Sequence, residues 1–152
     1  LPEPHNFDIL FSEKDPLFVL AHKNNPWFLK DSESISLKSL KDIPISINYG
    51  CLQLFENTCL ASKIQPKFIS ICTTKATTIQ FASLNLGISI VPAEKHEIFD
   101  ENLFVILINS NKLFIEKMLY KAKEKIFSPI VTNFIEFFLQ ESLKQSSKKS
   151  KV

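Results

Sequence analysis

The stretch FASLNLGISIVPAE, residues 81–94, contains the junction that decides the fold of this chain. An apolar helical pattern ends there, and a short β-branched run, ISIV, follows and is stopped by a proline. Asn85 tolerates the left-handed conformation that ends a helix, and Gly87 permits a close reversal from helix to strand. The only two glycines, Gly50 and Gly87, both lie where a predicted strand meets a predicted helix. Such junctions are where open α/β sheets bind ligands.

Strands and helices alternate along the rest of the chain. A short helix capped by Ser36 is predicted before the second strand, and a longer one after it carries Leu52, Phe55 and Cys59 on one face. Thr73 or Thr74 caps the helix that runs to Leu84, and the last helix opens at Ser128–Pro129. The predicted strands cover residues 17–22, 43–48, 67–72, 88–92, 103–108 and 116–122. This alternation predicts an α/β fold with a mostly parallel sheet flanked by helices.

Composition sets the broad class of the protein. Of the 152 residues 45% are hydrophobic and 22% charged, which is typical of a soluble globular domain, and a net charge of +2 gives no argument for nucleic-acid binding. No apolar run is long enough to span a membrane. Cys51, Cys59 and Cys72 form no metal-ligand or CxxC spacing, and Cys59 and Cys72 fall on apolar positions, so we expect buried free thiols in a cytoplasmic protein. The chain begins without an initiator methionine, which suggests a fragment or a processed form.

Several blocks, taken in order, resemble the effector-binding region of LysR-type transcriptional regulators. The turn Asn24-Asn25-Pro26 follows the first strand as the x-His-Pro turn does in that family. SKIQP, residues 62–66, stands where the family has AGF-x-P, and LNLGISIVP, residues 84–92, stands where it has A-G-L-G-I-x-L-L-P. Further similar blocks are ISLKSLKDIPISINYG and MLYKAKEKIFSPIVTNFIEFFLQ. The resemblance covers residues 17–140 without a large gap.

The resemblance implies a periplasmic-binding-protein-like type 2 fold, in which two lobes hold an effector in their cleft. This chain would supply one periplasmic-binding-like (Rossmann-like) lobe plus a C-terminal return helix. Residues 1–13 would lead in from a missing first lobe, 14–127 form the second lobe, 128–144 the return helix and 145–152 a disordered basic tail. The family's N-terminal helix-turn-helix is absent. Asn85 and Lys63 replace family glycines, the latter suggesting a different helix end, and Ala76 replaces an acidic residue often found early in the pocket helix.

Two junctions are the candidate effector site. Backbone N–H groups in INYGC point outward at a helix start, where they can hold a carboxylate, and the hydroxyls of CTTK stand at another helix start on a neighbouring strand. By resemblance, the residues lining this lobe's share of the cleft would be Asn48, Tyr49, Gly50, Cys51, Thr73 and Thr74. The alternative is that Thr73 or Thr74 only caps its helix and Gly50 only turns the chain.

No arrangement of residues predicts catalysis, a metal or a cofactor. His5, His22 and His96 lie beside no candidate nucleophile, and GCL after a strand lacks the flanking glycines of a nucleophile elbow. Lys121, Lys123 and Lys125 alternate along a strand end and could either contact a phosphate or form a solvated edge. The loop acids are expected to be solvated: Glu13, Asp15, Glu94, Glu97, Asp100 and Glu101.

The resemblance therefore implies a ligand-sensing, non-enzymatic module that binds a small anionic metabolite and modulates transcription. It implies a homo-oligomer that contacts DNA only through a helix-turn-helix domain absent from this chain, and no membrane partner. The alternative hypothesis is a stand-alone solute-binding lobe, or a truncated remnant, without regulatory output. An upstream winged-helix segment would support the regulator, whereas an upstream signal peptide would support a solute-binding protein.

Overall fold

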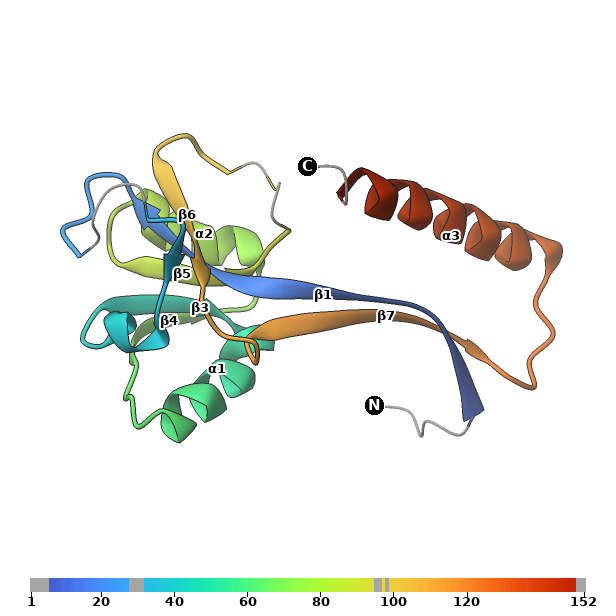
Figure 1. The fold of residues 1–152 in the computed structure, drawn as a ribbon, viewed down its shortest axis with the longest axis horizontal. Coiled ribbons are helices and arrows are strands. Elements are labelled where there is room, and N and C mark those ends of the chain that lie inside the picture. The colour runs from blue at the N-terminus through green and yellow to red at the C-terminus, as the bar shows by residue number, and fades with distance from the viewer. Residues whose placement is uncertain (1–5, 28–31, 95–96, 98, 150–152) are drawn as a thin grey trace. The chain divides into compact units, whose positions relative to one another are not determined.

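A computed structural model describes residues 6–27, 32–94, 97 and 99–149, with only the backbone of residues 144–149. The chain divides into two compact units (Figure 1). The larger unit is Lys14–Ile115, and the smaller unit combines Leu1–Glu13 with Glu116–Val152. The predicted second lobe, 14–127, therefore extends past the end of the larger unit at Ile115.

The sheet has seven strands in the order β2-β6-β1-β5-β3-β4, with β7 pairing β1 outside that order. β3 runs parallel to both β4 and β5, and β2 runs parallel to β6. β1 runs antiparallel to β5 and β6. The strands are β1 (Phe7–His22), β2 (Ser34–Ile35), β3 (Pro44–Asn48), β4 (Lys67–Cys72), β5 (Ile88–Pro92), β6 (Leu103–Ile108) and β7 (Phe114–Ala122). The predicted α/β class with a mostly parallel sheet is confirmed.

The helices begin where the sequence predicts them. The 3-10 helix η2 (Leu37–Leu40) is capped by Ser36, and α2 (Lys75–Ser83) is capped by Thr74. α1 (Tyr49–Ala61) follows β3 directly, and α3 (Pro129–Lys149) opens at the predicted proline. Each cap side chain accepts a hydrogen bond from a backbone N–H of the first turn, which would otherwise lack a partner.

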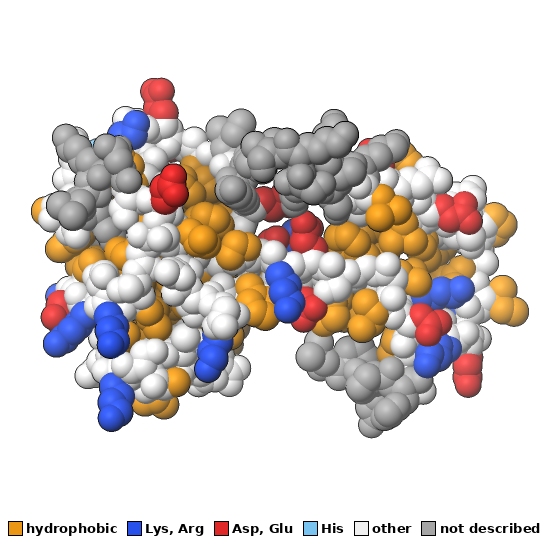
Figure 2. All heavy atoms as spheres, in the orientation of Figure 1, with side chains coloured by type: hydrophobic (Ala, Val, Ile, Leu, Met, Phe, Trp, Pro, Cys, Tyr) orange, Lys and Arg blue, Asp and Glu red, His pale blue; other side chains and the backbone are white. Residues whose placement is uncertain are grey.

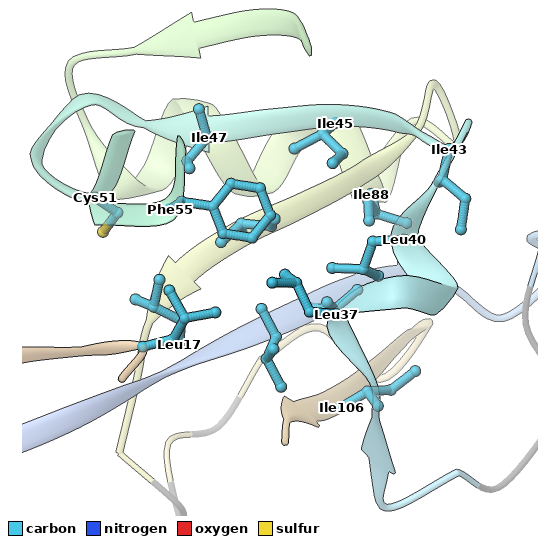
Figure 3. Close-up of a cluster of buried hydrophobic side chains, with 14 of the residues drawn as sticks. Leu17, Leu37, Leu40, Ile43, Ile45, Ile47, Cys51, Phe55, Ile88 and Ile106 are labelled. Carbon is cyan, nitrogen blue, oxygen red and sulfur yellow. The ribbon is translucent and has the colours of Figure 1, made fainter. Parts of the chain in front are cut away.

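Two apolar layers lie on opposite faces of the sheet, because neighbouring residues of a strand point to opposite sides. α1 covers one face with Cys51, Phe55 and Cys59, which are buried against a cluster that includes Ile45, Ile47 and Ile90 (Figure 3). α2 covers the other face, where Ala82 packs with Leu20, Val91 and Leu103. The predicted face of α1 is thus shifted slightly, since Leu52 is only half-buried and Cys51 is fully buried.

Both long helices of the larger unit end in a left-handed residue that is not glycine. Lys63 has φ 57° and Asn85 has φ 54°. After α1 the Ile64 N–H donates to the Cys59 carbonyl at 2.9 Å, and after α2 the Leu86 N–H donates to Phe81 at 3.0 Å. These are the bonds of a Schellman motif. The expectation that Lys63 ends its helix differently from a glycine is therefore wrong. The hydrogen bonds to the last carbonyl groups of the helix offset the modest free-energy cost of a lysine in the left-handed conformation.

The smaller unit consists of the first part of β1, most of β7, and α3. Phe7 packs edge-on against Tyr120 with ring centroids 5.7 Å apart, and Phe11 packs edge-on against Phe138 at 5.4 Å. Besides the pairing of β7 with β1, the Lys123 N–H donates to the Asn6 carbonyl, and the Ser12 hydroxyl donates to Glu116 at 2.6 Å. Only residues 17–22 of β1 were predicted, because the earlier residues become a strand by pairing with β7.

The apolar residues of α3 are divided between its buried and exposed sides. Ile135, Phe138 and Leu139 are half-buried, whereas Phe134 and Phe137 remain more than half exposed. Hydrophobic side chains are visible on the surface of the chain (Figure 2). The helix also continues to Lys149, past the predicted end at residue 144. A helix adds one backbone hydrogen bond for each residue it gains, so a polar tail can extend it. Residues 150–152 of the predicted disordered tail lie outside the described residues. None of the described helices is long and apolar enough to cross a membrane.

Candidate functional site

The carboxyl ends of three parallel strands meet at one edge of the larger unit. Asn48, the last residue of β3, pairs with Cys72, the last of β4, and Ile47 pairs with Ile90 near the end of β5. α1 and α2 start from the first two of these ends (Figure 1). The two predicted junctions are therefore neighbours in space, although the paired residues Asn48 and Cys72 are 24 positions apart in the sequence.

At the first junction Asn48 caps α1. Its Oδ1 accepts a hydrogen bond from the Gly50 N–H at 3.1 Å. Tyr49 is 67% exposed, whereas the Cys51 side chain is 1% exposed and belongs to the hydrophobic core. Any contact between Cys51 and a ligand at this edge would therefore come from its backbone, because the helical period turns its side chain toward the sheet.

At the second junction Thr74, and not Thr73, is the cap. Thr74 Oγ1 accepts a hydrogen bond from the Thr77 N–H at 3.1 Å and lies 2.9 Å from the Thr77 hydroxyl. The predicted capping role is thus confirmed for Thr74. Thr73 is exposed beside it. Thr74 and Thr73 bring two hydroxyl groups to the edge at which Asn48 ends its strand.

The two helix N-termini give this edge a partial positive charge. Neither α1 nor α2 has an acidic residue in its first turn, so the partial positive charge of each N-terminus is not offset there. Lys75, the first residue of α2, adds a full charge, and its Nζ lies 2.6 and 2.7 Å from the two carboxylate oxygens of Glu97. Glu97 is thus paired and not simply solvated as predicted.

Lys75 was not among the predicted site residues. Burial raises the pKa of the Cys51 thiol to about 11, and the charge of Lys75 partly counteracts this shift, so Lys75 acts on the start of α1 as well as α2. The sequence held one signal for it. A lysine in the first turn of a helix is electrostatically unfavourable, so its presence there is unusual.

Cys72 sits beneath this edge in a group of hydroxyls. Its Sγ lies 3.2 Å from the Ser70 Oγ and 3.6 Å from the Ser46 Oγ. Burial raises the pKa of this thiol, but hydrogen bonds with Ser70, Ser46 and Thr78 outweigh burial and leave the pKa below its ordinary value. All three cysteines are free and buried, as the sequence predicts.

Other features of the larger unit lie apart from this edge. A groove of about 650 Å³ is lined by Leu60, Ile64 and Phe68 among others, where α1 ends and β4 begins. That is the opposite end of the sheet from Thr74, so the groove does not belong to the candidate site. Among the histidines, His22 Nδ1 accepts a hydrogen bond from the Asn24 N–H, while His5 and His96 lie outside the described residues.

Comparison with solved structures places the fold. The effector-binding domain of QuiR in complex with shikimate aligns with a TM-score of 0.73 and 25% identity over 95% of this chain. The chain has the fold of a LysR-type effector-binding domain. CbnR, a LysR family transcriptional regulator, aligns at 0.71 with 16% identity over 93% of the chain. The regulatory domain of CcmR from Synechocystis PCC6803, in complex with 2-PG, aligns at 0.67 with 16% identity over 92%.

The resemblance found in the sequence is thereby confirmed. The chain spans 69% of the QuiR and CcmR domains and half of CbnR. No protein-family model and no curated protein matches the chain. Within the LysR-type fold, Asn85 and Lys63 keep the left-handed helix ends despite replacing the family's glycines.

Proposed function

We propose that this chain is the ligand-sensing module of a LysR-type transcriptional regulator and binds a small anionic metabolite. One observation carries the proposal: two helix N-termini without acidic residues, together with Lys75, meet at a single sheet edge. Helix N-termini present free N–H groups and partial positive charge, which favour a carboxylate or phosphate. In the similar QuiR domain the bound molecule is shikimate, a hydroxylated carboxylate, which fits this class.

The roles of the individual residues follow from their positions. The backbone N–H groups of Tyr49 and Cys51 would hold a carboxylate at the start of α1, beside Gly50. The hydroxyls of Thr73 and Thr74 would bind ligand hydroxyl or carboxylate oxygens, while Asn48 orients the first turn through its bond to Gly50. None of these residues is a nucleophile with a general base beside it, so the proposed role is binding without catalysis.

Replacing Thr74 with valine tests this site. The change keeps the side-chain shape and removes the hydroxyl, so it should weaken shikimate binding and lower the free energy of unfolding by about 0.5–2 kcal/mol through loss of the cap. Thr74→Ser should retain both properties. Isothermal titration with shikimate, followed by a thermal-shift screen of small carboxylates, measures the binding.

Thr58→Val is the matched control. Thr58 Oγ1 donates to the Leu54 carbonyl at 2.8 Å within α1, away from the edge. Loss of the Thr58 hydroxyl should leave the affinity for shikimate unchanged. Equal affinity of the Thr74→Val variant and the parent would remove Thr74 from the binding site.

DNA binding would belong to a helix-turn-helix domain outside this chain. Effector binding would shift the arrangement of the lobes and thereby change how an oligomer binds DNA. The free thiols fit a cytoplasmic location. The alternative, a solute-binding lobe without regulatory output, is not favoured by the similar structures, which are regulators.

Self-association is expected to occur through α3. Ile130, Phe134 and Phe137 are 81%, 61% and 64% exposed, and soluble monomers rarely leave such a patch open. Light scattering at micromolar concentration should show a dimer or larger species, and Phe134→Glu should shift it toward monomer. Thr132→Glu, on the same helix, is the control for added charge. A monomeric parent whose α3 amides exchange slowly would show that the helix docks within its own chain.

A further inference from the structure

The ion pair between Lys75 and Glu97 places an anionic group of the chain itself at the candidate site. Both carboxylate oxygens lie within 2.7 Å of the Lys75 Nζ, and the two side chains are 33% and 36% exposed. The ring of Phe99, two residues after Glu97, lies 5.4 Å from the same ammonium group. Lys75 therefore contacts both a carboxylate and an aromatic ring of the same segment.

This arrangement resembles the contact that an anionic effector would make. Lys75 stands at the first position of α2, next to the cap Thr74, and its charge acts on Cys51 at the start of α1. An incoming carboxylate at this edge needs the same ammonium group that Glu97 occupies. One cation cannot make two close, well-aligned contacts with both carboxylates without bringing like charges together.

We infer that Glu97 is an internal competitor of the effector, which pairs with Lys75 in the free chain and is displaced from it by the effector's anionic group. The inference rests on the proposed function, since it concerns the same edge. Glu97 would thereby lower the affinity for weak anions and make Lys75 a determinant of specificity. A ligand must bring a carboxylate or phosphate, because a neutral molecule cannot replace the Glu97 charge.

A first experiment tests the pair without any ligand. Acetylation of the full chain by acetic anhydride, followed by mass spectrometry, reports the reactivity of Lys75 relative to the exposed Lys38. Glu97→Gln should raise Lys75 acetylation at least twofold, because the Lys75 side chain loses its ion pair with the carboxylate and becomes more accessible to the reagent. Glu101→Gln changes an exposed acid in the same connection between β5 and β6, and as the matched control it should leave Lys75 acetylation unchanged. Equal Lys75 acetylation in the parent and in Glu97→Gln would overturn the inference.

A second experiment tests the competition with shikimate as the probe. An exposed ion pair contributes little, so Glu97→Gln should tighten binding by about 1.5- to 5-fold. Lys75→Met should weaken it about tenfold or more, since it removes a charged hydrogen-bond partner. If the parent binds shikimate and Glu97→Gln binds it no more tightly, the competition is overturned while the proposed function stands. If no variant binds any small carboxylate, the proposed function fails and the competitive role fails with it.

Discussion

Replacing Phe55 with alanine is expected to lower the free energy of unfolding by about 3–5 kcal/mol. Phe55 is fully buried within the apolar cluster (Figure 3). It lies edge-on to Phe68 with ring centroids 6.3 Å apart. The Phe55 side chain packs α1 against the sheet. Truncation to alanine therefore removes buried apolar surface and leaves a cavity that the surrounding β-branched residues cannot fill. Urea denaturation followed by circular dichroism measures the loss.

Two further variants make this result interpretable. Leu60→Ala changes a side chain on the same helix that is 76% exposed, and it should change stability by less than about 1 kcal/mol. Phe55→Leu keeps most of the volume and should fold even if the alanine variant does not. Similar losses for Phe55→Ala and Leu60→Ala would contradict the assigned core position of Phe55.

Gly87→Val is expected to lower the free energy of unfolding by about 1–3 kcal/mol through steric overlap. A Cβ atom at Gly87 would lie 2.5 Å from the Pro44 carbonyl oxygen and 3.0 Å from the Ile69 side chain. Because the overlap involves backbone and begins at the Cβ itself, Gly87→Ala should already be destabilising. Thermal unfolding of both variants against the parent measures the effect.

Gly50→Ala is the control for adding a methyl group. A Cβ there would meet only the Asn48 Oδ1 at 3.2 Å, so the change should cost far less. Stability of Gly87→Val equal to that of the parent would show that the junction tolerates side chains. Close approach, and not a positive φ, is the reason for the glycine, since neither glycine of the chain has a positive φ.

Local signals in the sequence determined the helix starts, several strands and the two junctions of the candidate site. Ser36 and Thr74 are caps because a short polar side chain accepts a backbone N–H of the first turn, which depends only on neighbouring residues. Strands β4, β5 and β6 have the predicted bounds because runs of β-branched residues bounded by turn residues also carry their information locally. The order and spacing of these elements sufficed to identify the LysR-type fold.

Tertiary structure alone decided the features that join residues distant in the sequence. The first part of β1 is a strand because β7 pairs with it, the Cys51 side chain turns into the core because α1 packs on the sheet, and Lys75 meets Glu97 across 22 positions. Composition around each residue does not encode these contacts. They arise when burial of the apolar faces brings separate elements together, and only then do the charges at the sheet edge acquire their partners.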